Sequence, residues 1–361
     1  MKWSEKMGIK QLMLKSLTLI GASLFMISTV VAQENSDLTK KILTLDYAIS
    51  SAMDREERFG VLDQQIDAYD EQIKVITDYA SPLYYSTKYA QDSVIQQKKL
   101  LKDSVGYKVT LLYDSIIMLQ KQIELNKVDI EIAEKELKQV EVKNKNGQLS
   151  ELSLAEAKAN LEKKQAEQKQ NLLSLEDYKN QFFNVTHIDI ENYDTIEENL
   201  SYEPLDYPGG TNALIHWNVD YYLQNTEAYI AYQNNNIIDY TQYKYNVYTG
   251  IPENILKTAK AEVAQSTYDT QKQKKNMIES LQSCVAELEK LQQTIAMQQT
   301  EIENQKANLE LSKIKYEHGY IGQVELQKSE KALLQLELAH IQNIYTYQQQ
   351  KMVLEKPWVK Y

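Results

Sequence analysis

Proline is absent from two long stretches of this chain, and this absence limits what the chain can fold into. The five prolines are Pro82, Pro204, Pro208, Pro252 and Pro357, so residues 83–203 and 253–356 contain none. Proline breaks the interior of a helix, and both stretches are rich in glutamine, glutamate, lysine, leucine and alanine, which favour helices. The sequence therefore predicts an all-α fold built largely from two long helical segments.

Apolar residues recur every seven positions in both stretches, and a constant offset of 172 residues relates the two series. The first series is Val109, Ile116, Ile123, Ile130 and Leu137, and the second is Leu281, Leu288, Ile295, Ile302 and Leu309. A sustained seven-residue apolar repeat is typical of a left-handed coiled coil. We interpret the constant offset as an internal duplication.

A second line of positions beside each series is only half apolar. It consists of Leu112, Leu119, Asn126, Ala133 and Val140 in the first copy, and of Cys284, Leu291, Gln298, Gln305 and Ser312 in the second. Such a narrow apolar stripe predicts thin contacts between helices, or helices that line water, rather than a thick globular core.

Each helical pattern is interrupted at a glycine, Gly147 or Gly319, and resumes within a few residues. Glycine suits the left-handed conformation that ends many helices. Ser150 can cap the next helix in the first copy, and Gly322 takes that place in the second. The apolar repeat changes phase across each interruption, so we expect the chain to reverse direction there. The sequence thus predicts two long antiparallel coiled-coil hairpins, with tips near 144–152 and 316–324.

The first 32 residues have the pattern of a secretory signal peptide. Four lysines precede an apolar run from Leu17 to Val31, which ends on the small-residue pattern Val30-Val31-Ala32. An uncleaved N-terminal anchor is the alternative. Removal of residues 1–32 takes away four lysines and one glutamate, which changes the net charge from −11 to −14. We therefore expect an exported protein of the cell envelope, located in the periplasm or outer membrane if the host has one and otherwise outside the cytoplasm or at the cell surface.

The mature chain divides into a first helical repeat at 33–183, a linker at 184–213 and a second helical repeat at 214–361. The linker is acidic, contains two prolines and the pair Gly209-Gly210, and lacks a helical period. A short strand is expected within it at 186–190. Two further proline-containing stretches, 81–89 and 245–254, are expected to be non-helical.

The composition excludes several classes of function. The acidic balance argues against nucleic acid, which is bound mainly through cationic contacts to phosphate. The only cysteine, Cys284, rules out an intrachain disulfide and falls on a helical seam position, where we interpret it as a small core residue. None of the four histidines forms a metal-ligand pair, and no nucleotide-binding or hydrolase motif occurs. We predict no enzyme activity and no cofactor, and we interpret the 26 tyrosines as packing residues.

The two interruptions carry a resemblance to a known family. The second reads KYEHGYIGQVELQKSEKAL at 315–333 and the first reads KNKNGQLSELSLAEAKANL at 143–161. Together with the opening LTLDYAI at 43–49, they resemble the duplicated tip signature and the start of the TolC family of outer-membrane efflux proteins. The resemblance spans most of residues 43–355. Tyr316 matches the tyrosine of the family's signature, whereas the first copy has Asn144 at that place.

The resemblance implies a homotrimer whose helices form a hollow tube and whose tips dock on a periplasmic adaptor protein that serves an inner-membrane pump. It implies a passive conduit for efflux or export that opens by movement of the tips. The tip residues to which it assigns docking are Gly147, Leu149, Ser150, Leu152, Tyr316, Gly319, Ile321, Gly322 and Val324.

The family also builds a membrane β-barrel from two strands in each copy, and a spanning strand needs about 9–11 alternating residues. The equivalent places here hold only SPLYYSTKY and YNVYTGIPEN, and charged helical sequence follows each of them. The sequence therefore predicts little or no β-barrel. The alternative function is a non-conducting structural coiled-coil protein of the cell envelope.

Overall fold

A computed structural model of the chain describes residues 41–79, 81–242 and 253–360. The signal peptide expected at 1–32 lies outside these residues. The helices are α2 (Leu45–Arg55), α3 (Arg58–Val75), α4 (Pro82–Lys145), α5 (Glu151–Thr186), α6 (Gly210–Gln242), α7 (Glu253–Glu317) and α8 (Gln323–Glu355). The shorter elements are the strands β1 (Ile42–Leu43) and β2 (Thr195–Ile196) and the 3-10 helices η1 (Ile190–Asn192) and η3 (Pro357–Val359).

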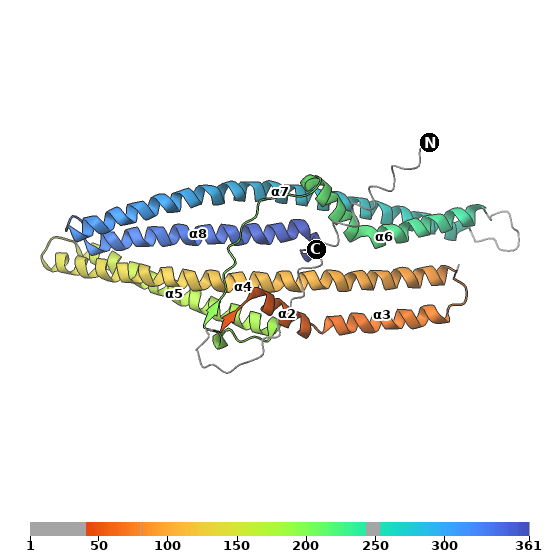
Figure 1. Cartoon of the computed structure of the whole chain (residues 1–361), viewed down its shortest axis with the longest axis horizontal. Coiled ribbons are helices and arrows are strands. Elements are labelled where there is room, and N and C mark those ends of the chain that lie inside the picture. The colour runs from red at the N-terminus through yellow and green to blue at the C-terminus, as the bar shows by residue number, and fades with distance from the viewer. Residues whose placement is uncertain (1–40, 80, 243–252, 361) are drawn as a thin grey trace, which may run out of the picture. The chain divides into compact units, whose positions relative to one another are not determined.

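Two long helical hairpins dominate the fold, one formed by α4 and α5 and the other by α7 and α8 (Figure 1). Helix α4 has 64 residues and α7 has 65. At ~1.5 Å per residue each is about 95 Å long. The prediction of an all-α fold with two long antiparallel hairpins is confirmed.

The first long helix begins earlier than the sequence analysis predicted. Residues 81–89 were expected to be non-helical, but α4 starts at Pro82. Proline is favoured in the first turn of a helix, and the Ser81 hydroxyl caps that turn by accepting a hydrogen bond from the Tyr84 amide at 3.2 Å. The other such stretch, 245–254, lies mostly outside the described residues, and α7 begins at Glu253.

The four hairpin helices pack in the order α5, α4, α8, α7 (Figure 1). Helix α4 contacts α5 on one side and α8 on the other, and α8 contacts α4 and α7. The two hairpins therefore meet along α4 and α8. Helices α2 and α3 also pack against α4, and α6 packs against α7.

The seven-residue series form the cores of the two hairpins. Eight of the ten positions are buried, and the other two, Ile130 and Leu137, are half-buried. Val109 and Ile116 pack with residues of α2 and α5, whereas Leu281 and Leu288 pack in a separate cluster with residues of α6 and α8. Each hairpin thus has its own core, as expected from a duplicated pattern.

The linker differs in detail from the prediction. The strand expected at 186–190 is absent, because α5 continues to Thr186. The His187 amide still donates to the Phe183 carbonyl at 2.7 Å, and the left-handed backbone of His187 (φ 54°) then ends the helix. The strand is β2 instead, which pairs in parallel with β1. The Tyr113 hydroxyl fastens this pair to α4 by donating to the carbonyl oxygens of Leu43 and Glu197.

Candidate functional site

The first hairpin tip, between α4 and α5, is built around Gly147. Its φ of 71° is left-handed, and its amide donates to the Asn144 carbonyl at 2.8 Å. The next amide, of Gln148, donates to the Lys143 carbonyl at 2.8 Å. These two bonds form a Schellman motif, which satisfies the last free carbonyls of α4. The Ser150 hydroxyl then caps α5 by accepting from the Ser153 amide at 3.2 Å, as the sequence predicted.

The second tip, between α7 and α8, repeats this geometry. Gly319 has a φ of 73°, its amide donates to the Tyr316 carbonyl at 2.9 Å, and the Tyr320 amide donates to the Lys315 carbonyl at 2.8 Å. The helices end and begin 172 residues after their counterparts. The one difference in capping is Gly322, which stands at the start of α8 and has no side chain to accept a bond.

The predicted tip residues differ widely in exposure. Leu152 is 69% exposed, and Tyr316 is also exposed. The three glycines and Ser150 are exposed, while Leu149 and Ile321 are half-buried. Val324 is only 4% exposed, so it packs inside the second hairpin and offers little surface to a partner.

Sequence reasoning missed one prominent residue of the second tip. Tyr320 is 80% exposed and lies beside the His318 ring, with the ring centroids 6.3 Å apart. A large aromatic residue directly after the glycine of a Schellman motif lies beyond the last turn of the helix, where the hairpin provides no core to cover it. An aromatic residue directly after the tip glycine is therefore the sequence signal by which Tyr320 could have been found. The first copy has Gln148 there.

Polar contacts near the tips join the two hairpins. Lys328 of α8 pairs with Glu136 of α4 at 2.6 Å, and the Lys135 ammonium donates to the Gln327 amide oxygen at 2.8 Å. Further along α4, Asp129 is almost fully buried and pairs with Lys331 of α8 at 2.6 Å and with Lys164 of α5 at 3.4 Å. Asp129 therefore links three helices, and relative movement of the two tips requires these contacts to change.

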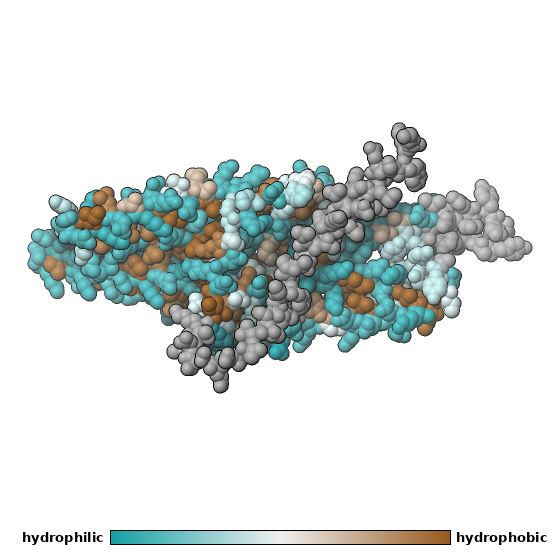
Figure 2. Space-filling model, in the orientation of Figure 1, coloured by the Kyte–Doolittle hydropathy of each residue, from teal (hydrophilic) through white to brown (hydrophobic). Residues whose placement is uncertain are grey.

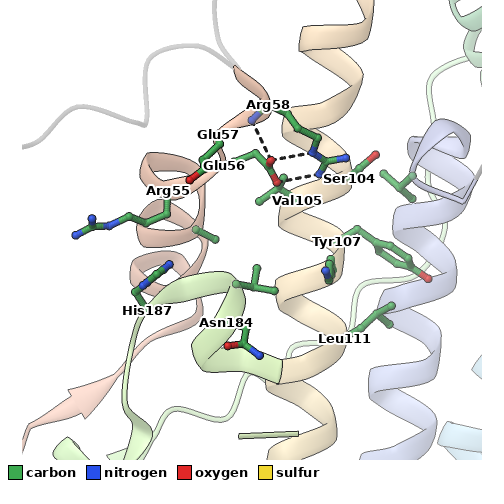
Figure 3. Close-up of a pocket in the computed structure, with 14 residues that line it drawn as sticks. Arg55, Glu56, Glu57, Arg58, Ser104, Val105, Tyr107, Leu111, Asn184 and His187 are labelled. Carbon is green, nitrogen blue, oxygen red and sulfur yellow. Dashed lines mark hydrogen bonds and ion pairs between the residues drawn. The ribbon is translucent and has the colours of Figure 1, made fainter. Parts of the chain in front are cut away.

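A second candidate site is a pocket of about 770 Å³ between the α2–α3 corner, α4 and the end of α5 (Figure 3). Its lining includes the apolar residues Ala52 and Val105. In its wall, the Glu56 carboxylate accepts hydrogen bonds from the backbone amide of Arg58 and from the guanidinium, the latter at 2.8 Å each. This guanidinium lowers the pKa of the Glu56 carboxyl.

The Arg58 guanidinium is bound to the Glu56 carboxylate, so its charge is not available to a ligand in this pocket. Arg55, Lys108 and His187 also line it, but all three are exposed side chains, and Glu57 places a negative charge among them. The arrangement holds the corner between α2 and α3 and offers no preorganised ligand for an anion. No motif in the sequence pointed to this pocket, because its residues come from α2, α3, α4, α5 and η3.

The other residues that the sequence analysis considered for chemistry have no arrangement suited to catalysis or metal binding in the described part of the chain. Cys284 is half-buried, its thiol donates to the Gln350 carbonyl at 3.6 Å, and burial raises the pKa of that thiol, which suits a packing role. Among the residues that the structure describes, no group of three histidine, cysteine, aspartate or glutamate side chains is placed to hold a metal ion. Within the same residues, none of the helices combines the length and the apolar character that crossing a bilayer requires.

No protein-family model matches the sequence, and no curated protein matches it. Solved outer-membrane channels nevertheless share its fold. The Campylobacter jejuni CmeC outer membrane channel superposes with a TM-score of 0.63 at 12% identity, covering 91% of this chain and 90% of that chain. CusC, studied for transmembrane channel formation, gives 0.61 at 12% identity, covering 91% and 95%. The outer membrane protein VceC from Vibrio cholerae gives 0.58 at 12%, covering 87% and 95%.

At this level of identity the likeness concerns the fold. The chain has the fold of TolC-family outer membrane channels, with two helical hairpins in one polypeptide. These neighbours are channel proteins and not enzymes.

Proposed function

We propose that this chain is an exported component of the cell envelope that forms a passive duct for efflux or export. Copies of the chain assemble as a homotrimer around a water-filled lumen. The hairpin tips dock an adaptor protein that connects the duct to a pump in the inner membrane. The fold of the neighbouring channels supports this proposal. The observation that carries it is that the two outer helices, α5 and α7, expose apolar residues.

Helices α5 and α7 form the two edges of the four-helix layer, and each has exposed apolar residues. On α5 an exposed line recurs every seven residues at Leu152, Ala159, Ala166 and Leu173. On α7 the exposed apolar residues include Met297, Leu311 and Ile314. A seven-residue repeat of small and apolar residues is a coiled-coil seam, and such a seam needs a second helix.

Figure 2 shows brown apolar residues among the mostly hydrophilic surface of the hairpins. A ring of copies, in which α5 of one protomer packs against α7 of the next, covers both edges at once. This closed arrangement also leaves no edge helix unpaired.

The first test is the solution mass of residues 33–361, measured by light scattering during size exclusion. The expected result is a mass near three times that of the chain, with hollow rings in negative-stain images. A monomer, or a solid bundle without a lumen, contradicts the duct and favours the non-conducting structural coiled-coil protein.

The second test concerns docking at the tips. Tyr320→Asp places a charge on an exposed tip residue that lies outside the α5 line, and it should weaken cross-linking to the host's adaptor protein in intact cells. The matched control is Val75→Asp, an equally exposed apolar residue at the end of α3. Equal cross-linking by both variants and the parent chain rules out the second tip as a docking surface.

A further inference from the structure

Six tyrosines form a continuous cluster where α4 meets α6, far along α4 from the tips. The cluster consists of Tyr79, Tyr84, Tyr85, Tyr89, Tyr229 and Tyr232, with successive ring centroids 4.8–5.7 Å apart. Four of these residues belong to the first repeat and two to the second. Ring packing accounts for the carbon faces, and phenylalanine would serve that purpose equally well. The chain has only 4 phenylalanines beside its 26 tyrosines, and packing alone does not explain the hydroxyl groups.

Next to the cluster is a pocket of about 340 Å³ between α4 and α6. Every residue that lines it is uncharged, in a chain where a quarter of the residues are charged. Besides Ala90, the lining consists of aromatic, hydroxyl and amide side chains, namely Ser86, Tyr89, Ser93, Gln96, Asn225, Thr226 and Tyr229. This combination of ring faces and neutral hydrogen-bonding groups is suited to a neutral ligand rich in hydroxyl groups.

A buried amide network fixes the floor of this pocket. The Gln96 side chain is buried, and its Nε2 donates to the Tyr221 carbonyl at 2.7 Å. Its Oε1 accepts from the Asn225 Nδ2 at 3.0 Å, and the same Nδ2 donates to the Asp92 carbonyl at 3.0 Å. Both amide donors of Asn225 are therefore directed to the protein, and its Oδ1 remains as an acceptor.

Further polar groups of the lining have no hydrogen-bond partner in the part of the chain that the structure describes. The hydroxyl groups of Ser93, Thr226, Tyr89 and Tyr229 make no hydrogen bond to a residue that the structure describes. The charged residues nearby are paired instead, with Lys88 on Asp92 at 3.0 Å and Lys274 on Asp220 and Glu227. The pocket thus presents free hydroxyl groups and ring faces but no free charge, which disfavours phosphate or carboxylate ligands.

We propose that this pocket binds a neutral saccharide of one or two sugar rings. The apolar face of a sugar ring packs on Tyr89 and Tyr229, which meet at 62° with their centroids 5.7 Å apart and so form two walls of a corner. The sugar hydroxyl groups donate to the Asn225 Oδ1 and exchange bonds with Ser93 and Thr226. A lipid surface is the competing ligand, but a concave site with hydrogen-bonding walls suits a saccharide better than a flat interface. This inference does not rest on the proposed duct function.

The test uses the mature chain and two probes, cellobiose and N,N′-diacetylchitobiose, with binding followed by saturation-transfer NMR and titration calorimetry. We expect millimolar binding of at least one probe. Tyr229→Ala should weaken that binding about tenfold, since it removes one ring face. The control is Tyr320→Ala at the second tip, which leaves the affinity unchanged.

Thr226→Val provides a second variant that keeps the side-chain shape and removes only an exposed hydroxyl. It should weaken binding while leaving the unfolding transition in place. Absence of binding by both probes overturns the proposal, as does equal binding by the Tyr229 and Tyr320 variants. Vesicle flotation with neutral phospholipid tests the alternative that the tyrosine cluster contacts a membrane. Flotation that is lost in Tyr229→Ala, without any saccharide binding, assigns the cluster to membrane contact and overturns the saccharide site.

Discussion

Helices α4 and α7 occupy corresponding places in the two hairpins, yet their surroundings differ. Helix α4 packs against α2, α3, α5, α6 and α8, whereas α7 packs against α6 and α8. All five positions of the seven-residue series are buried on α7, whereas on α4 three are buried and two are half-buried. The second lines differ, because Leu112, Asn126 and Ala133 are buried on α4 while their counterparts on α7 are only half-buried.

This comparison shows which part of a duplicated sequence remains alike and which part diverges. The seam that closes each hairpin faces the same environment in both copies and stays apolar. The second line of α7 faces its own partner helix, because four of its members form hydrogen bonds with α8, namely Cys284, Gln298, Gln305 and Ser312. On α4 the corresponding line is more apolar and more buried, since more helices pack against α4. Four predictions test this difference, from the largest expected effect to the smallest.

The largest effect is expected at the seam. Ile116→Ala and Leu288→Ala each remove a fully buried side chain, and each should lower the free energy of unfolding by about 3 kcal/mol. Met297→Ala, at the edge of α7 that the proposed ring covers, should change it by less than about 0.5 kcal/mol where the chain is a monomer. Denaturant unfolding at one fixed protein concentration measures all three. A large effect at Met297 would mean that another copy covers this edge under those conditions.

The second prediction concerns a buried carboxyl group on α4 that has no counterpart at the equivalent position of α7. Asp114 is 5% exposed, its Oδ2 accepts from the Gln349 amide at 2.8 Å, and burial raises the pKa of this carboxyl to about 6. The folded chain therefore binds this proton more tightly than the unfolded chain. The free energy of unfolding should rise as the pH falls from 7 to 4, by about 2 kcal/mol from this group.

Asp114→Asn should remove this dependence and stabilise the chain at pH 7 by about 2 kcal/mol, since the amide carries no charge to bury. The counterpart position on α7 is Ala286, which is exposed, so Ala286→Asp should be nearly neutral at either pH. Thermal unfolding at pH 7 and pH 5 measures both variants. A parent chain that is less stable at pH 5 than at pH 7, with Asp114→Asn unchanged between them, contradicts this account.

The third prediction tests whether the tips are equivalent. Gly147→Ala and Gly319→Ala should each cost about 1 kcal/mol, because both glycines have a positive φ that alanine adopts with strain. No atom lies within 4 Å of the added methyl group at either position, so the cost is conformational. Gly60→Ala, in open space within α3, is the control and should stabilise the chain by about 0.5–1 kcal/mol. Unequal costs at the two tips would show that their environments differ.

The smallest effect is expected at the caps. Ser150→Gly should cost a few tenths of a kcal/mol, and Gly322→Ser should gain about as much, since serine caps a helix slightly better than glycine. A side chain at position 322 displaces the flexible end of Glu325, which a Cβ would meet at 2.7 Å. Paired unfolding curves measure both changes. A loss of more than about 1 kcal/mol in Gly322→Ser would mean that Glu325 is held in place.

The sequence predicted those features that depend on local pattern. The seam positions, the reversal at Gly147 and Gly319, and the cap at Ser150 follow from periodicity and from backbone preferences that operate within a few residues. The start of α4 was placed too late, because Ser81-Pro82 was interpreted as a break although it is also a helix start.

Features that depend on how the hairpins pair were not predicted. A seven-residue repeat specifies which helices form a hairpin, but not that α4 meets α8 while α5 and α7 remain at the edges. The burial of Asp114 and Asp129 follows from that pairing. The same holds for the pocket at Gln96 and Asn225, which draws its lining from two helices distant in sequence.

The two Schellman tips of each chain determine how many tips a ring of chains presents and which symmetry those tips have. Each chain presents two tips of one backbone geometry, so a ring of three chains presents six. The backbone then approximates sixfold symmetry, while the side chains retain only threefold symmetry, because Tyr320 alternates with Gln148 around the ring. A partner that contacts backbone alone meets six equivalent places, and one that contacts the tyrosine meets three.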